Sequence, residues 1–345
     1  MDEIKTLIFR TDRLGDFIIS CPFIISYKIN FPDTNITLVS SEYNSNYIKN
    51  FNFINEIKPL KNEIKFFSKL IILIKMILNL RKSKFKDIII LDGKKRSFFI
   101  SLFLNGEKSI LLQSKNLAIL SKIFNYNSVN NYEFQDQLKN FSFLASLLNF
   151  NINQKEIDVY QNYKFEKRFY FKKKYIIIHL DEKWYSDFYY KDFTNINPNS
   201  FQIKIFVEKL IEIIKEDFEI VITTGSKNTE QIDSFISEFE TKDNKLFTQI
   251  INNTNITFIK NTTFNDLESL VKNSSFLICC EGGISHVSHN CYVDTIAFYE
   301  KNRLEHTKHW TGHMSKLSLY ERKNMTDLLV DDNFFNLFKT KIRQI

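Results

Sequence analysis

The chain has 345 residues, which indicates two domains, and its 43% hydrophobic and 25% charged residues exclude a mainly disordered protein. With only 7 glycines and 4 prolines it is neither collagen-like nor rich in flexible linkers, so each glycine is informative. The net charge of +7 favours anionic partners such as phosphates, a lipid headgroup surface or an acidic substrate. The basic residues are scattered and no nucleic-acid-binding motif is present, so we expect no nucleic-acid partner.

Cysteine usage and the N-terminus predict a cytoplasmic protein. The 4 cysteines have no C-x-x-C spacing, a pattern typical of reduced, intracellular proteins. Asp2 and Glu3 stand where a secretory signal peptide would carry basic residues.

Short apolar strands alternate with helical patterns along the first 150 residues. The predicted strands are 5–9, 36–40, 87–91 and 108–112, and the predicted helices are 17–30, 66–80 and 96–104, with further helical stretches to about residue 150. Continuous apolar strands separated by helices indicate a parallel sheet that is covered on both faces.

The most apolar of these helices is 66–80 (FFSKLIILIKMILNL). It is shorter than the roughly 20 residues that a membrane span needs, and it contains Lys69 and Lys75. Two interpretations remain: a buried helix of a globular domain, or a helix whose apolar face touches a bilayer surface without crossing it.

The second half of the chain repeats the alternation after a polar, aromatic-rich connection at 151–174. The predicted strands are 175–180, 219–223, 256–259, 276–280 and 294–299, and the predicted helices are 201–216, 264–273, one starting near 283, and 332–345. Two such series predict two doubly wound domains. We expect an N-terminal domain at 1–165, a C-terminal domain at 166–330, and a terminal helix at 331–345 that packs back on the N-terminal domain.

All 6 histidines lie in the second half of the chain. His286 and His289 have helical spacing, but no carboxylate or cysteine stands near them at a recognised ligand spacing, so we expect no metal site. We expect His306, His309 and His313 to lie in a loop.

In parallel α/β domains, ligands bind beyond the carboxyl ends of the strands. The loop after the first predicted strand, residues 10–16 (RTDRLGD), has four charged residues and one glycine. In one interpretation Asp16 only caps the next helix, a contribution of about 0.5–2 kcal/mol. In the other, Gly15 permits a tight turn and Asp16 extends from the sheet edge as a general base. The residues alone support both equally.

Two later loops have unusual residues in the same position after a strand. In residues 280–289 (CEGGISHVSH), paired glycines permit close approach to an anion at a helix start, or simply form a tight turn. In residues 179–184 (HLDEKW), Lys183 either neutralises a phosphate or is an ordinary solvated lysine. A weaker candidate is the turn at Thr224 and Gly225 with Glu230, which suits a nucleotide ribose.

In this order, the loops resemble those of the ADP-heptose:lipopolysaccharide heptosyltransferases, a family of inverting glycosyltransferases. RTDRLGD is similar to the family's R-x-D-x-x-G-D element, and YIIIHL with Lys183–Trp184 is similar to its Lys–Trp element. VITTG with Glu230 resembles the family's nucleotide-side turn, and EGGISHV resembles its D-x-G-x-S-H segment, with Glu281 in place of the aspartate. The resemblance implies an α/β protein of the GT-B fold, with two doubly wound Rossmann-like domains facing a central cleft.

The resemblance also implies a role for each loop. The first domain would bind the acceptor through Arg10, Asp12 and Arg13, and Asp16 would take the proton of the attacking hydroxyl. The second domain would bind an ADP-heptose-like nucleoside-diphosphate sugar, with no obligatory metal or cofactor. The residues expected to bind this donor are His179, Lys183, Thr224, Gly225, Glu230, Glu281, Gly282, Gly283, Ser285 and His286.

The expected activity is transfer of a heptose or related sugar to a hydroxyl of a lipopolysaccharide-type or other surface-glycan acceptor, a glycolipid or an oligosaccharide. A lipid-linked acceptor agrees with the positive charge and the apolar first half, so we expect peripheral contact with the cytoplasmic face of the inner membrane. Two other hypotheses stay open: a sugar-nucleotide epimerase of the same two-domain shape, and a non-catalytic module that binds nucleotide sugars.

Overall fold

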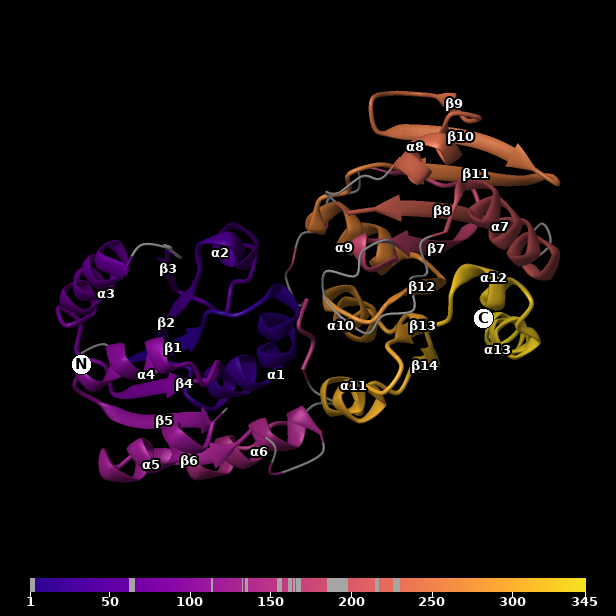
Figure 1. Cartoon of the computed structure of the whole chain (residues 1–345). Helices are drawn as coiled ribbons and strands as arrows, with labels where there is room; N and C mark the ends of the chain where they lie inside the picture. Colours follow the sequence, from indigo (N-terminus) through magenta and orange to yellow (C-terminus); the bar gives the residue numbers. More distant parts are fainter. Residues whose placement is uncertain are drawn as a thin grey trace. The chain divides into compact units, whose positions relative to one another are not determined.

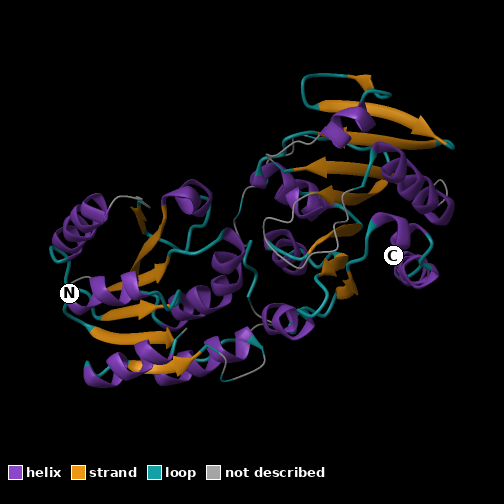
Figure 2. Cartoon of the chain, viewed as in Figure 1, coloured by secondary structure: helices purple, strands orange, loops and turns teal. Residues whose placement is uncertain are grey.

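The computed structural model describes residues 4–61, 66–112, 114–131, 133, 136–153, 157–160, 163, 165, 169–184, 198–214, 217–225 and 230–345. The chain divides into two compact units. The first unit comprises Met1–Lys164 with Lys308–His313, and the second comprises Phe165–Thr307 with Met314–Ile345. Figure 1 labels the helices and strands, and Figure 2 separates them by colour.

A parallel six-stranded sheet with the order β3-β2-β1-β4-β5-β6 forms the centre of the first unit. Its strands are β1 (Ile4–Arg10), β2 (Thr34–Ser41), β3 (Glu56–Leu60), β4 (Asp87–Ile90), β5 (Glu107–Leu112) and β6 (Asn127–Asn130). Its helices are α1 (Leu14–Asn30), α2 (Glu42–Ile48), α3 (Phe66–Leu80), α4 (Lys95–Leu102), α5 (Lys115–Ile123) and α6 (Gln137–Leu147). The chain order reverses between β1 and β4, so the connections after these neighbouring strands lead to opposite faces of the sheet.

Helices cover both faces of this sheet because its strands are apolar on both sides. On one face, Ile77 of α3, Phe98 of α4 and Leu117 of α5 share a core with Phe9 and Ile90. Elsewhere in the unit, α1 packs against α6. In the part of the chain that the structure describes, no helix is both long and apolar enough to cross a membrane.

An eight-stranded sheet with the order β14-β13-β12-β7-β8-β11-β10-β9 forms the centre of the second unit. Its strands are β7 (Lys174–Leu180), β8 (Phe218–Thr224), β9 (Glu240–Thr241), β10 (Leu246–Ile251), β11 (Thr254–Ile259), β12 (Phe276–Cys280), β13 (Asp294–Tyr299) and β14 (Leu317–Glu321). All pairs are parallel except those of β10, which is antiparallel to both neighbours. The helical elements are the 3₁₀-helix η2 (Glu182–Trp184) and the α-helices α7 (Ser200–Ile214), α8 (Glu230–Ile236), α9 (Phe264–Asn273), α10 (Gly283–Asn290), α11 (Leu304–Thr311), α12 (Met325–Leu329) and α13 (Asp332–Ile342).

The terminal helix α13 packs within the second unit. Its Phe334, Phe338 and Ile342 are buried in the same core as Phe206 of α7. The expectation that this helix packs on the N-terminal domain was therefore wrong. Helical spacing predicts an apolar face, but it does not say which core will bury that face.

The predicted α/β class with two doubly wound sheets is confirmed, and the differences concern single elements. Hydrophobic periodicity did not indicate α2, β3, β6, α8, β9, β10, α11, β14 and α12, most of which are short or only partly buried and so lack a clear hydrophobic period. His306 and His309 lie on α11 rather than in a loop.

We predict that Phe334→Ala lowers the free energy of unfolding of the second unit by about 3–5 kcal/mol, because it leaves a cavity among packed rings. The Phe334 ring stacks on Phe298 at 5.4 Å, and Phe298 lies 5.3 Å from the buried Trp184. Trp184 fluorescence during denaturant unfolding therefore follows the change. Val330→Ala, at a side chain that is 77% exposed, should leave the transition in place. Equal transitions for both variants would contradict the prediction.

Candidate functional site

Each sheet places polar residues at the point where its chain order reverses. In the first unit β1 pairs with β4, and residues 10–16 and 91–96 follow these strands. In the second unit β7 pairs with β12, and residues 181–184 and 281–283 follow them. Ligands of open parallel sheets bind beyond the strand ends at such points. Each unit therefore contains one candidate site.

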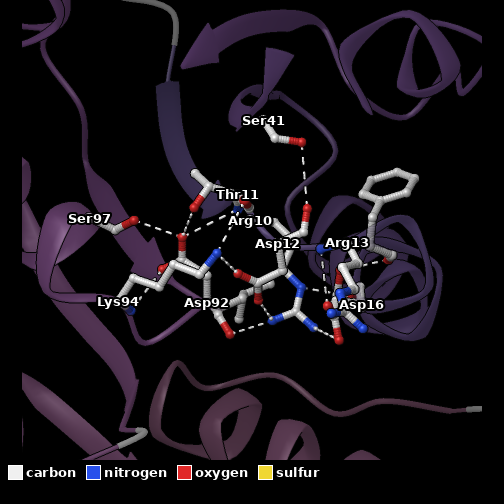
Figure 3. Close-up of polar contacts among 12 residues, drawn as sticks. Arg10, Thr11, Asp12, Arg13, Asp16, Ser41, Asp92, Lys94 and Ser97 are labelled. Atoms are coloured by element: carbon white, nitrogen blue, oxygen red, sulfur yellow. Dashed lines mark hydrogen bonds and ion pairs between the residues drawn. The ribbon is translucent and has the colours of Figure 1, made fainter. Parts of the chain in front are cut away.

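Arg10 organises the site of the first unit (Figure 3). Its side chain is 1% exposed, and its Nη1 donates to the carbonyl oxygen of Leu91 at 2.6 Å and lies 3.3 Å from Asp12 Oδ2. Its Nε donates to the carbonyl oxygen of Asp16 at 2.7 Å. A buried cation is costly unless it is paired and hydrogen-bonded. These contacts therefore connect the ends of β1 and β4 to the first turn of α1.

Asp16 lies in the first turn of α1. Its Oδ2 accepts a hydrogen bond from the Arg13 amide at 3.1 Å, and its Oδ1 lies 3.9 Å from Arg10 Nη2. The helix starts at Leu14 rather than at the predicted residue 17, so Gly15 and Asp16 belong to the helix and not to the preceding loop. Asp16 thus makes a capping contact, as the first of its two interpretations predicts. At the same time 26% of its side chain stays exposed to solvent, so a role as a base is also open to it.

The sequence analysis missed Asp92, which fixes the same loop from the β4 side. Its buried carboxylate accepts hydrogen bonds from the Thr11 hydroxyl at 2.6 Å, the Thr11 amide at 3.2 Å and the Ser97 hydroxyl at 2.7 Å. Burial, with a smaller contribution from Asp12, raises its pKa. Gly93 has a φ of 55°, which lets the Lys94 amide turn back to Asp92 Oδ1 at 3.1 Å. The one sequence feature that could have indicated Asp92 is the polar segment at residues 91–96 (LDGKKR), which directly follows a predicted strand.

A cavity of about 470 Å³ lies beside this loop. Its lining includes the hydroxyl-bearing residues Thr11 and Ser41 and the cationic residues Lys94 and Arg96. Lys94 Nζ pairs with Asp12 Oδ1 and donates to the carbonyl oxygen of Thr11 at 3.2 Å. Glu42 and Tyr43 also line the cavity, so its hydroxyl groups and charges of both signs suit a hydroxyl-rich ligand.

In the second unit, Lys183 connects the two strand ends at the reversal point. Its Nζ donates to the carbonyl oxygen of Glu281. A Cβ atom at Gly282 would collide with Lys183 Nζ, so the close approach of the ammonium group requires glycine there. Gly282 is the N-cap of α10, and Gly283 is its first residue. The structure therefore brings a cation and a helix N-terminus together, and both attract anions.

His179 is packed inside the second unit. Its Nδ1 lies 2.9 Å from Thr223 Oγ1, and its carbonyl oxygen accepts from Trp184 Nε1 at 3.0 Å. Burial lowers the pKa of His179 to about 4, so the ring is neutral at pH 7. These contacts connect β7, β8 and η2. They therefore fix the position of the short helix that carries Lys183.

Asp181 is a second group that the sequence analysis missed at this strand end. Its Oδ1 accepts a hydrogen bond from the Lys183 amide at 3.1 Å. Burial raises the pKa of Asp181 to about 6, against the opposing effect of the Lys183 charge. This carboxyl group therefore titrates close to neutral pH.

Other predicted donor residues hold the surrounding turns. Thr224 Oγ1 accepts from the Asn261 amide at 3.0 Å, which fixes the loop after β11. The buried Ser285 hydroxyl donates to the carbonyl oxygen of Gly282 at 2.6 Å, and His286 is buried on the same helix. Gly225 comes near Glu182: a Cβ there would lie 3.5 Å from Glu182 Oε2. Glu230 is the exposed first residue of α8, and the preceding residues 226–229 lie outside the described ranges.

A small pocket at the ends of β12 and β13 combines the predicted Lys183 with charged residues that no sequence motif indicated. Lys183, Arg303, His306 and Arg322 are among its lining residues. Burial, followed by the nearby Arg303 charge, lowers the pKa of His306, and Arg322 Nη1 donates to Cys280 Sγ at 3.2 Å. Glu281 and Glu300 also line this pocket of about 20 Å³, so its three cations exceed its two carboxylates by one charge. Arg303 and Arg322 follow β13 and β14, and no motif marks them in the sequence.

No metal centre is evident in the ranges that the structure describes. Among those residues, no three His, Cys, Asp or Glu side chains are grouped to hold an ion. The two strand-end sites therefore consist of hydroxyl groups, carboxylates, amides and cations.

The chain is similar to known proteins in structure but not in sequence. No protein-family model matches the chain, and no curated protein is similar to it in sequence. Solved structures do match over nearly its full length: the chain has the GT-B fold, two doubly wound α/β units in one polypeptide.

Glycosyltransferases are among the matching structures. Escherichia coli heptosyltransferase WaaC with ADP-2-deoxy-2-fluoro heptose is 12% identical, with a TM-score of 0.69 over 99% of both chains. A glycosyl transferase family 9 protein from Veillonella parvula DSM 2008 is 12% identical, with a TM-score of 0.70 over 100% of this chain and 99% of that one. UDP-GlcNAc 2-epimerase from Methanocaldococcus jannaschii, 13% identical, has a TM-score of 0.52 over 94% of this chain and 91% of its own.

The low pKa of His179 predicts a stability change in acid. Between pH 6.5 and 4 the unfolded chain binds a proton that the folded chain excludes, so stability falls as the pH falls through this range. At pH 4.5 the wild type should have lost about 2.5 kcal/mol more than His179→Gln, both relative to pH 7. The raised pKa of Asp181 changes stability with pH in the opposite direction. Because this contribution is the same in both proteins, it cancels in the difference between them. Parallel pH profiles in denaturant unfolding would contradict the assignment.

Proposed function

We propose that this protein is a glycosyltransferase of the heptosyltransferase type, which transfers a sugar from a nucleoside-diphosphate donor to a hydroxyl of a glycolipid or oligosaccharide acceptor. One observation carries the proposal: three of the four loops that resemble the family's motifs, those with Asp16, Lys183 and Gly282, follow strands at the reversal points of the two sheets. The shared fold over 99% of the chain supports it.

The second unit is the proposed donor-binding unit. Lys183, Arg303 and Arg322 would neutralise the diphosphate, and the start of α10 at Gly282–Gly283 would offer amide groups to it. The structure of WaaC with ADP-2-deoxy-2-fluoro heptose supports an ADP-linked sugar as donor. His179, Thr224 and Ser285 would act by holding these groups in position, since their hydrogen bonds join neighbouring strands and turns.

The first unit is the proposed acceptor-binding unit, with Asp16 as the general base. The Arg13 amide donates to one carboxylate oxygen of Asp16 and Arg10 Nη2 lies 3.9 Å from the other, so the group is oriented while the side chain remains partly exposed. The cavity beside Thr11, Ser41, Lys94 and Arg96 would receive the acceptor, and its polar lining would hydrogen-bond the hydroxyl groups of a sugar.

In the proposed reaction, the acceptor oxygen bonds to the anomeric carbon as the bond from that carbon to the diphosphate oxygen breaks. The hydroxyl proton passes to Asp16, and the nucleoside diphosphate leaves with the electron pair from the opposite face, with inversion. The Lys183 ammonium would stabilise the charge that develops on the leaving group. Asp16 needs to accept the proton only as the new bond forms, and correct positioning offsets its weak basicity.

We expect Asp16→Asn to fold normally and to lose about 10²–10⁴-fold in kcat, the range of a lost general base. Asparagine keeps an oxygen that can accept from the Arg13 amide, so the helix start is preserved. Thermal unfolding checks the fold, and Asp33→Asn, a change at an exposed aspartate, is the matched control for lost charge. An unimpaired kcat in Asp16→Asn would refute the base assignment.

We expect Lys183→Ala to weaken binding of ADP by about tenfold to a hundredfold, the effect of losing one hydrogen-bonded charge partner. Isothermal titration calorimetry with ADP measures the change. Lys204→Ala removes a surface lysine on α7 that pairs with Glu238, and it should leave the affinity unchanged. Equal affinities for the wild type and Lys183→Ala would count against the phosphate role.

One incubation separates this proposal from the alternatives. The protein is mixed with ADP- and UDP-sugars, with and without a lipopolysaccharide acceptor that lacks heptose, and the products are identified by mass spectrometry and NMR. We expect a glycosylated acceptor and free nucleoside diphosphate. An isomerised sugar nucleotide would instead identify an epimerase, and binding without turnover would identify a non-catalytic module.

A further inference from the structure

Three helices of the first unit carry an unusual share of exposed apolar side chains. Of the twenty-two large hydrophobic side chains that are exposed among the described residues, eleven lie on α3, α4 and α5 or on the residue that directly follows α4 or α5. They are Phe67, Leu70, Ile71, Ile74, Leu78, Phe99, Phe103, Ile119, Leu120, Ile123 and Phe124, together called the apolar face. Such concentrations on a protein surface mark interaction sites.

The helix α3 is apolar on two sides. Ile77 and Leu80 are buried in the core of the first unit, whereas Ile71 and Ile74 are 53% and 47% exposed. The exposed residues have the spacing of one helix face. The core therefore accounts for only half of this helix's hydrophobicity, and the second side requires another explanation.

The segment that contains these helices has a strongly positive net charge. Residues 66–130 contain twelve Lys and Arg but only three Asp and Glu, a net charge of +9, whereas the whole chain carries +7. The excess arises chiefly because acidic residues are scarce in this segment, since the other 35 of the 47 basic residues are scattered over the rest of the chain. Of the three acidic residues, Asp87 and Asp92 are buried, and only Glu107 is exposed. Lys69 and Lys75 lie beside the exposed side of α3, and Lys115 and Lys122 lie on the exposed side of α5.

We propose that the apolar face docks on an anionic lipid bilayer, with its apolar side chains in the interfacial layer and its lysines at the lipid phosphates. Exposed apolar residues flanked by lysines are the chemistry of helices that lie in a membrane interface. A second copy of this chain is a poor occupant, because it would bring two strongly positive surfaces together. An anionic bilayer complements both the charge and the hydrophobicity.

Docking would also bring lipid close to the first-unit site. The helices α3, α4 and α5 each follow a strand, so each begins at the carboxyl edge of the sheet, where residues 10–16 lie. Lys94, the N-cap of α4, and Arg96 in its first turn line the cavity beside that loop. If the proposed glycosyl transfer is correct, a lipid-linked acceptor would meet the cavity at the membrane surface. The docking itself does not depend on transfer activity.

Vesicle co-sedimentation of the full chain tests the proposal. We expect the wild type to bind vesicles of phosphatidylcholine and phosphatidylglycerol in equal amounts, and to bind pure phosphatidylcholine vesicles far less. Ile71→Asp with Ile74→Asp should lower the binding constant by more than about tenfold. Lys69→Gln with Lys75→Gln should lower the vesicle binding constant by about fivefold for each lysine. This decrease should be smaller at high salt, because salt screens the attraction between the lysines and the lipid phosphates.

Matched controls separate docking from general charge and folding effects. Ile250→Asp with Val330→Asp places the same two charges at exposed apolar positions of the second unit and should bind vesicles like the wild type. Circular dichroism and thermal unfolding confirm that each variant is folded. Equal binding by the Ile71 and Ile74 variant and the control would overturn the proposal. So would a dimer, seen by light scattering, that the Ile71 and Ile74 changes convert to monomer, because a second copy would then cover this face.

Discussion

The charge of Arg10 is buried at the end of β1, and the organisation of the first-unit site follows from the need to balance it. Its guanidinium group takes partners from the loop after β1, from the segment after β4 and from the start of α1. Without these partners the guanidinium group would be a buried, unpaired cation, which costs several kcal/mol. The same contacts hold Asp16 at a defined place on the sheet edge. The contacts that neutralise the buried charge of Arg10 thus also position Asp16.

The second unit solves a similar problem with a different residue. Lys183 extends from η2 to the turn after β12, and the space for its ammonium group exists because residue 282 has no Cβ. In both units the chain order reverses between two adjacent parallel strands, so the two following loops separate and leave their polar groups at the edge. The topology therefore creates the position, and a few charged side chains give each position its chemistry.

Much of this arrangement could be predicted from particular residues. The apolar runs of β1, β4, β7, β8 and β12 predicted the parallel sheets, and polar loops with rare glycines after three of them predicted the sites. Asp92, Asp181, Arg303 and Arg322 were not predicted, because a single charged residue after a strand resembles any solvated side chain. The charge of residues 66–130 was visible in the sequence, but its meaning depends on which sides of α3, α4 and α5 remain exposed.

The sequence by itself determined the alternation of strands and helices and the order of the polar loops, because hydrophobic periodicity and glycine placement are local properties. Only the tertiary structure decided which strands became neighbours, which core buried α13, and that the start of α1 includes Asp16. It also decided that His179 is a neutral, packed ring and that Arg10 is a buried cation. Burial and pairing between distant segments set these outcomes, and neither can be derived from a residue's immediate neighbours in the chain.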